Sequence, residues 1–191
     1  MNRNLMIIIV VAVVLVLLAC CCVLAVIGGV TLTSAGGIAA LLNAPAPYGI
    51  DSRPTVPASA TPGSIFPATV SGYKAEPAGP IANFAGAVLP EGARIAVYTG
   101  AAGKARVIAV QTTSEAQARE LVGRVKDRAE GYSSESILSR DLPGKPAFVQ
   151  WHVSALKENA YGVIWNNGAW VFVVVSTSEA ARDAVAGSFP Y

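Results

Sequence analysis

The sequence predicts a membrane-tethered protein with one α+β domain, in which an antiparallel sheet packs with two helices. Three observations support this prediction: an apolar run at Leu5–Ile27, a proline-rich stretch after it, and alternating strand and helix patterns toward the C-terminus. We expect a tail and membrane segment over 1–27, a linker over 28–63 and the domain over 64–191. That domain is long enough to bury a core without disulfides.

The apolar run Leu5–Ile27 contains no charge, proline or glycine. At ~1.5 Å rise per residue, a helix of this length reaches across a ~30 Å hydrocarbon core, and a helix satisfies its own backbone polar groups in lipid. We therefore expect a single-pass signal-anchor in the cell membrane. Arg3 precedes the run and the next basic residue is Arg53, so the positive-inside rule places the N-terminus in the cytoplasm and the C-terminal domain outside.

Cys20, Cys21 and Cys22 are consecutive within the apolar run, so they cannot form a disulfide framework. The stretch Leu17–Cys20 resembles the lipobox of bacterial lipoprotein signals, which makes Cys20 a candidate lipidation site. The leucine before Ala19 and the apolar residues after Cys22 count against lipidation. Signal-peptidase cleavage near Thr33–Ala35 is a further alternative, but the length of the apolar run favours a retained anchor.

The linker has two parts of different composition. Gly28–Leu42 is small, uncharged and glycine-punctuated, and three interpretations stay open: a continued membrane helix, an interfacial segment or a flexible one. Asn43–Gly63 holds five prolines among Ala, Ser and Thr. Because proline fixes φ and lacks a backbone donor, we expect an extended, polyproline-like stalk here.

Strand patterns fill most of the domain. The ranges we expect as strands are Pro67–Lys74, Ala93–Thr99, Ala105–Thr112, Ser136–Leu142, Ala147–Val153, Ala160–Trp165 and Ala169–Ser176. Asn167-Gly168 predicts a two-residue type I′ turn, which would place Trp165 opposite Trp170. The resulting hairpin is apolar on both faces, so it must be covered on both sides.

Two helices are predicted, over Ser114–Glu130 and Ser178–Ser188. The first has an apolar face and an opposite charged face, which is typical of a helix on a protein surface. Thr112 with Glu115, and Ser176 with Glu179, fit the capping box. The letters TSEA recur at an offset of 64 residues. Either the domain is a duplication of two strand-hairpin-helix halves, or any strand that enters a capped helix has this pattern.

Catalytic machinery is not indicated. His152 is the single histidine and falls on the polar side of its strand, where a solvent-facing ring is the simpler interpretation. The sequence has no G-x-S-x-G elbow and no metal-ligand spacing, so we predict no catalytic residue, no metal and no cofactor. The charges are balanced and interspersed, so we expect no nucleic-acid partner.

Large aromatic side chains gather on the strands near the C-terminus. The candidate binding face consists of Trp151, Tyr161, Trp165, Trp170 and Phe172. Trp and Tyr are favoured contact residues in interfaces. The alternative is that these rings form the hydrophobic core.

These observations predict a non-catalytic module, anchored through Leu5–Ile27, that acts as a protein-interaction or accessory component of a cell envelope. Its partner would be another envelope protein or a second copy of the chain. The alternative is a tethered small-molecule or lipid-binding domain with a pocket between sheet and helices. A hydrolase that uses His152 is the least favoured option.

Overall fold

The structure is a computed structural model that describes residues 45–131, 136–153 and 160–191. The predicted membrane segment Leu5–Ile27, Cys20 and the first part of the linker, 28–44, lie outside the described residues. Within the described ranges, no helix is long and apolar enough to cross a bilayer. Residues Pro45–Tyr191 form one compact unit with its own hydrophobic clusters, which is what independent folding requires.

A short 3-10 helix, η1, precedes the strands, and two α-helices follow later in this part of the chain. The helices are η1 (Pro47–Ser52), α3 (Glu115–Gly131) and α4 (Glu179–Ser188). The short strands are β1 (Thr69–Val70), β2 (Tyr73–Ala75), β3 (Gly79–Pro80), β4 (Asn83–Phe84) and β5 (Ala87–Val88). The longer strands are β6 (Arg94–Gly100), β7 (Gly103–Gln111), β8 (Ser136–Arg140), β9 (Phe148–Val153), β10 (Ala160–Asn167) and β11 (Trp170–Ser176).

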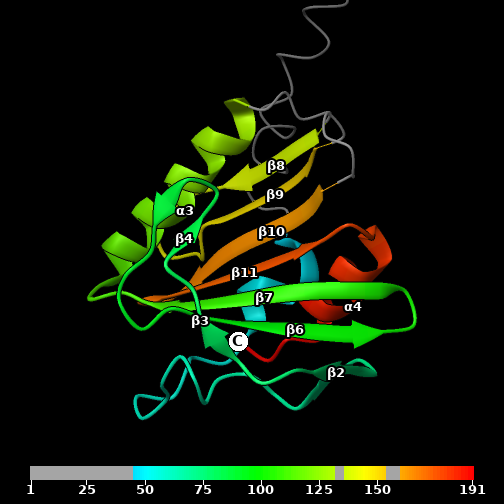
Figure 1. The fold of residues 1–191 in the computed structure, drawn as a ribbon. Coiled ribbons are helices and arrows are strands. Elements are labelled where there is room, and N and C mark those ends of the chain that lie inside the picture. The colour runs from blue at the N-terminus through cyan, green and yellow to red at the C-terminus, as the bar shows by residue number, and fades with distance from the viewer. Residues whose placement is uncertain (1–44, 132–135, 154–159) are drawn as a thin grey trace, which may run out of the picture. The chain divides into compact units, whose positions relative to one another are not determined.

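One large antiparallel sheet dominates the fold (Figure 1). Its strand order is β1-β2-β6-β7-β11-β10-β9-β8, with β3 also paired to β6, and β4 and β5 form a separate hairpin. The predicted α+β class, an antiparallel sheet with two α-helices, is confirmed for the part of the chain that the structure describes.

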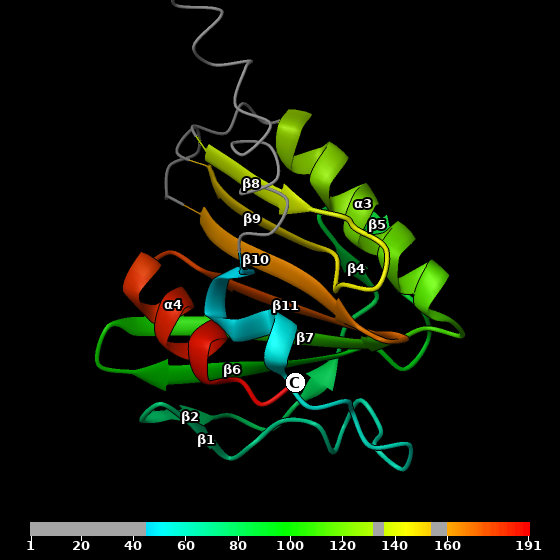
Figure 2. The same cartoon turned by 180° about the vertical axis from the view of Figure 1, so that it is seen from behind.

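The two α-helices cover opposite faces of this sheet. Figure 1 shows α3 and β4 on the near side, and Figure 2, from behind, shows α4 and η1 on the other side. We call these surfaces the α3 face and the α4 face. Buried α3-face strand residues are Ile108, Val110, Val149, Trp151, Val153, Ile164, Val171 and Val173. Buried α4-face strand residues include Tyr98, Val107, Val163, Trp165, Phe172 and Val174. The expectation that the central hairpin is covered on both sides is confirmed.

The β10–β11 turn lies one residue later than the sequence predicts. Asn167 pairs with Trp170, so Gly168 and Ala169 form the loop, and Trp165 lies opposite Phe172 rather than Trp170. Gly168 has φ +58°, whereas Asn167 and Ala169 do not have positive φ, so the turn does not follow the type I′ pattern that we expected. Because every partner shifts by two positions, the side chains keep their predicted faces.

Serines cap both α-helices, at positions other than the predicted ones. Ser114 Oγ accepts a hydrogen bond from the Gln117 amide at 3.2 Å, and Ser178 Oγ accepts from the Ala181 amide at 3.3 Å. The predicted cap residue Ser176 instead donates its hydroxyl to the Lys104 carbonyl at 2.7 Å. The helix starts are therefore as expected, but each cap lies two residues later, where the backbone has left the strand.

The 64-residue repeat does not correspond to a symmetric repeat of the sheet. That offset relates Val107 to Val171, yet Val107 is buried on the α4 face and Val171 on the α3 face. β7 and β11 are adjacent antiparallel strands, and a twofold axis that exchanges such strands leaves each residue on its original face. The two strand–helix units instead use opposite faces, so each helix covers a different side.

Residues 45–63, expected as part of an extended linker, pack against the domain. Ile50, Val56 and Ile65 are buried on the α4 face, and we call residues 45–66 the strap. The Arg53 guanidinium lies 4.4 Å from the Trp165 ring centroid and donates to the Tyr191 main-chain oxygen at 2.9 Å. Proline content indicated an extended chain, but the apolar residues between the prolines supply the contacts that hold the strap down.

An ion pair fastens the strap to the sheet edge. Arg140 of β8 donates to both carboxylate oxygens of Asp51, with Nη1 at 2.9 Å from Oδ2. Asp51 Oδ2 also accepts from the Ala46 amide at 3.1 Å. The hydrogen bonds from Arg140 are the main cause that lowers the pKa of Asp51, and burial opposes them.

We predict that a fragment beginning at Gly63 is less stable than one beginning at Pro45. The shorter fragment loses buried Ile50 and Val56, each of which contributes ~1.5–3 kcal/mol on burial, and exposes Trp165. Urea denaturation of the two fragments measures the difference. Coincident unfolding curves would show that the strap does not stabilise the domain.

We also predict that Asp51→Asn lowers the free energy of unfolding at neutral pH by about 1.5–3 kcal/mol, the range for hydrogen bonds to charged groups. A carboxylate with a lowered folded-state pKa stabilises the protein above its unfolded pKa, about 4, and this contribution disappears as pH falls through the folded pKa. The two unfolding free energies should therefore differ at pH 7 and converge in acid.

The matched control for this prediction is Asp141→Asn. Asp141 pairs with Arg119, but its side chain is 69% exposed, so we expect a change below about 1 kcal/mol. Equal losses for the two variants would contradict a special role for the Asp51 pair.

Candidate functional site

A cavity of about 800 Å³ opens on the α3 face, beside the C-terminal half of α3. It forms where the helix leaves the ends of several strands uncovered. Its lining comes from β4, β6, β7, β9, β10, β11 and α3, with residues that directly follow β2, β4 and β11. The site therefore depends on the whole sheet rather than on one local motif.

The floor of the cavity is one row of side chains across five neighbouring strands. In order, the row contains Val97, Arg106, Val175, Gly162 and Trp151, and all of these except Gly162 line the cavity. A Cβ atom at Gly162 would lie 2.1 Å from Trp151 Cζ2, so the indole lies directly against the glycine backbone. The missing side chain at 162 is what lets a tryptophan lie across the sheet here.

The wall opposite the sheet combines α3 with the β4–β5 hairpin. Phe84 of β4 lies 6.5 Å from Trp151 between ring centroids, and Val125 and Ala129 line the cavity from α3. Arg128 holds the hairpin in place, because its Nε donates to the Ala85 carbonyl at 3.2 Å. The wall is thus mainly apolar, and the Arg128 side chain links its hairpin to α3.

The rim carries three cations and one anion, a net charge of +2. Lys104 Nζ lies 3.8 Å from the Glu76 carboxylate, and both side chains are more than half exposed. Arg128 is bonded to the hairpin. Arg106 differs from both, because it has no ion pair or hydrogen-bond acceptor among the residues that the structure describes. The cavity therefore combines an apolar floor with one uncommitted guanidinium.

The lining residues favour binding over proton transfer. They include no histidine, cysteine or aspartate, and the one carboxylate, Glu76, faces Lys104. The Ser176 hydroxyl is occupied by the Lys104 carbonyl. In the described ranges, no cluster of three His, Cys, Asp or Glu side chains could hold a metal ion.

The five aromatic residues of the predicted binding face do not share one surface. Trp165 and Phe172 are 1% and 0% exposed, and with Trp170 they pack under α4 and the strap. Trp151 lies on the α3 face, in the cavity floor. Tyr161 is half-buried and stacks on His152, with ring centroids 4.3 Å apart. Only Trp151 of this set reaches the cavity.

His152 lies outside the cavity lining. It pairs across strands with Tyr161, which leaves its ring parallel to the phenol within 1°. The sequence signals that could have indicated the cavity are different ones: a glycine inside an apolar strand, Gly162, and an arginine inside another, Arg106.

A charge cluster around the buried Arg182 joins η1 to α4 on the opposite face. Arg182 is 2% exposed and pairs with Glu179 at 3.0 Å and Asp183 at 2.7 Å. The Tyr48 hydroxyl donates to Asp183 at 2.6 Å, and burial, followed by this hydrogen bond, raises the Tyr48 pKa well above its ordinary value. The cluster is satisfied internally, so its role is structural.

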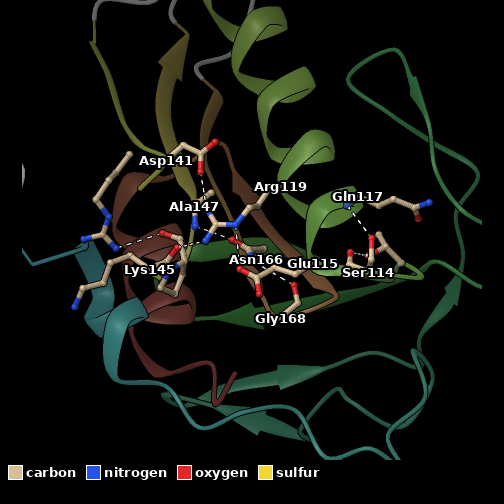
Figure 3. Close-up of polar contacts among 12 residues, drawn as sticks. Ser114, Glu115, Gln117, Arg119, Asp141, Lys145, Ala147, Asn166 and Gly168 are labelled. Carbon is tan, nitrogen blue, oxygen red and sulfur yellow. Dashed lines mark hydrogen bonds and ion pairs between the residues drawn. The ribbon is translucent and has the colours of Figure 1, made fainter. Parts of the chain in front are cut away.

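A second polar network lies at the N-terminal end of α3 (Figure 3). Arg119 donates to Glu115 at 3.0 Å and to Asp141 at 2.5 Å. Buried Asn166 accepts from the Ala147 amide at 2.6 Å and donates to the Gly168 carbonyl at 3.2 Å. These contacts join the helix start to the β8–β9 and β10–β11 connections, and they too are structural.

No protein-family model matches the sequence, and no curated protein matches it. Among solved structures, the domain is similar to a GTP binding regulator from Thermotoga maritima at 12% identity and a TM-score of 0.47. The match covers 64% of this chain and 81% of that one. A likeness this distant assigns no function.

We predict that Gly162→Ala destabilises the domain by about 1–3 kcal/mol, since the added methyl group must displace the Trp151 ring. In a Trp151→Leu background the same substitution should have a much smaller effect, because the clash is gone. Chemical denaturation of the four proteins completes this double-mutant cycle.

Gly123→Ala serves as the control for this cycle. No heavy atom lies within 4 Å of the added Cβ, and the site is inside α3, so alanine should stabilise the domain by about 0.5–1 kcal/mol. Additive effects of Gly162→Ala and Trp151→Leu would contradict the contact described here.

Proposed function

We propose that the domain is a non-catalytic binding module that takes a small, largely apolar molecule in the cavity on the α3 face. The observation that supports this most directly is the floor, where the Trp151 indole lies against Gly162 near Val175. Ligand sites in proteins occupy about 300–1,000 Å³ and are mostly apolar with few polar groups, and a cavity of about 800 Å³ fits this range.

The proposal includes the membrane anchor. The apolar run Leu5–Ile27 supports a single-pass protein with a cytoplasmic N-terminus and an external domain. Such an anchor would keep the binding module at the outer surface of a cell membrane, and lipidation at Cys20 is the alternative mode of attachment.

A second candidate function is an accessory module that contacts an envelope protein or a second copy of itself. The observation in its favour is β8, the last strand in the sheet order, where Leu138 is 54% exposed. A terminal strand offers unpaired backbone groups to another chain.

The test of the ligand proposal uses the neutral fluorescent probe N-phenyl-1-naphthylamine with the 45–191 unit. We expect saturable enhancement of probe emission. Val175→Trp, which fills the floor, should weaken probe binding by roughly tenfold or more, equivalent to about 1.4 kcal/mol.

Leu138→Trp is the control, because it adds the same side chain on exposed β8, away from the cavity, and should leave probe affinity unchanged. Circular dichroism confirms that both variants fold. An absence of saturable binding, or equal affinity in folded Val175→Trp, would refute the proposed ligand site.

A further inference from the structure

We infer that the ligand of this cavity is a free single-chain carboxylic acid, whose carboxylate is bound by Arg106 and whose chain lies over Trp151. This inference rests on the proposed function and specifies the ligand class of the same site. It follows from the position of Arg106, from the acceptors that the two neighbouring cations already contact, and from the length of the apolar floor.

The sheet register places Arg106 directly beside apolar residues. It pairs with Val97 of β6 on one side and Val175 of β11 on the other, and all three line the cavity. An arginine at this position puts a charged, planar donor at the end of a hydrophobic floor. A guanidinium binds a carboxylate through two parallel hydrogen bonds, which fixes both the charge and the orientation of a ligand head.

The other rim cations already have acceptors. Lys104 faces the Glu76 carboxylate at 3.8 Å, and Arg128 donates to the Ala85 carbonyl at 3.2 Å. Within the described part of the chain, Arg106 alone of the three rim cations has neither an ion pair nor an acceptor. One uncommitted guanidinium matches one carboxylate, rather than a polyanionic group.

The floor sets the length of the apolar part. From Arg106 it crosses from β7 over β11 and β10 to Trp151 on β9. Three strand spacings of ~4.8 Å give a path of about 14 Å, which suits a single acyl chain of medium length. The Trp151 indole occupies the space above Gly162, so beyond Val175 the indole itself forms the floor of this path.

The surroundings favour a free molecule over a lipid in a bilayer. The whole length of α3, whose C-terminal half borders the cavity, mixes both signs of charge. Its acidic residues are Glu115, Glu120, Asp127 and Glu130, and its basic residues are Arg119, Arg124, Lys126 and Arg128. Without Arg128, which belongs to the +2 cavity rim, the helix has four acidic and three basic residues, so it adds no attraction to an anionic membrane.

The experiment is calorimetric titration of the 45–191 unit with dodecanoate and with dodecan-1-ol, both below the concentrations at which they aggregate. We expect dodecanoate to bind roughly 10–100 times more tightly than the alcohol, the range of a charge-assisted hydrogen bond. Arg106→Gln should reduce dodecanoate affinity to that of the alcohol and leave alcohol binding unchanged. Arg106→Lys keeps the positive charge but loses the two parallel N–H donors of the guanidinium. Its affinity for dodecanoate should therefore lie between those of the unmodified protein and Arg106→Gln.

Arg124→Gln is the matched control, because Arg124 is exposed on α3 outside the cavity lining and should not affect either affinity. Equal binding of acid and alcohol, unchanged by Arg106→Gln, would overturn the carboxylate assignment and leave the proposed function standing. If dodecanoate, dodecan-1-ol and the neutral probe all fail to bind, both the carboxylate assignment and the proposed ligand site are overturned. Sedimentation of the unit with phosphatidylglycerol vesicles, abolished by Arg106→Gln, would assign the head to a bilayer lipid and overturn the free-acid inference.

Discussion

Burial of the central strands on both faces is the constraint on which this domain depends. β7, β11 and β10 carry apolar side chains on both sides, so each face needs its own cover. The α3 helix, of 17 residues, covers one face, whereas α4 has 10 residues and leaves part of the other to the strap. The opposite placement of the two helices, despite their similar TSEA starts, follows from this requirement.

The candidate site is a consequence of the same arrangement. A single straight helix cannot cover a twisted sheet completely, so the strand ends beside α3 remain open. Apolar residues line that opening because they belong to the hydrophobic side of the sheet, and Arg106 stands among them. The side of the sheet that is suited to burial is thereby left partly open, and Trp151, which lies against Gly162, forms part of the cavity floor.

Local patterns predicted the elements, and long-range packing decided the rest. The buried α3 residues Leu121 and Val125 follow helical periodicity, so that helix was predictable. The packing of the strap was not predictable. Its prolines indicated an extended chain, and its partners Trp165 and Arg140 lie far away in the sequence. The aromatic set was divided for a similar reason: strand alternation assigns a face, but it does not say whether a helix covers that face. The cavity is lined by six strands and one helix, and no local sequence pattern shows how these elements are placed together.

The strap also determines how the domain is held by the chain that precedes it. Any load carried along residues 1–44 enters the compact unit at Pro45 and is borne first by η1, through the Asp51 ion pair and the Arg53 contacts. Those attachments are on the α4 face, whereas the cavity opens on the α3 face. A pull on the chain before Pro45 is therefore carried first by contacts on one side of the sheet, whereas the cavity lies on the other side.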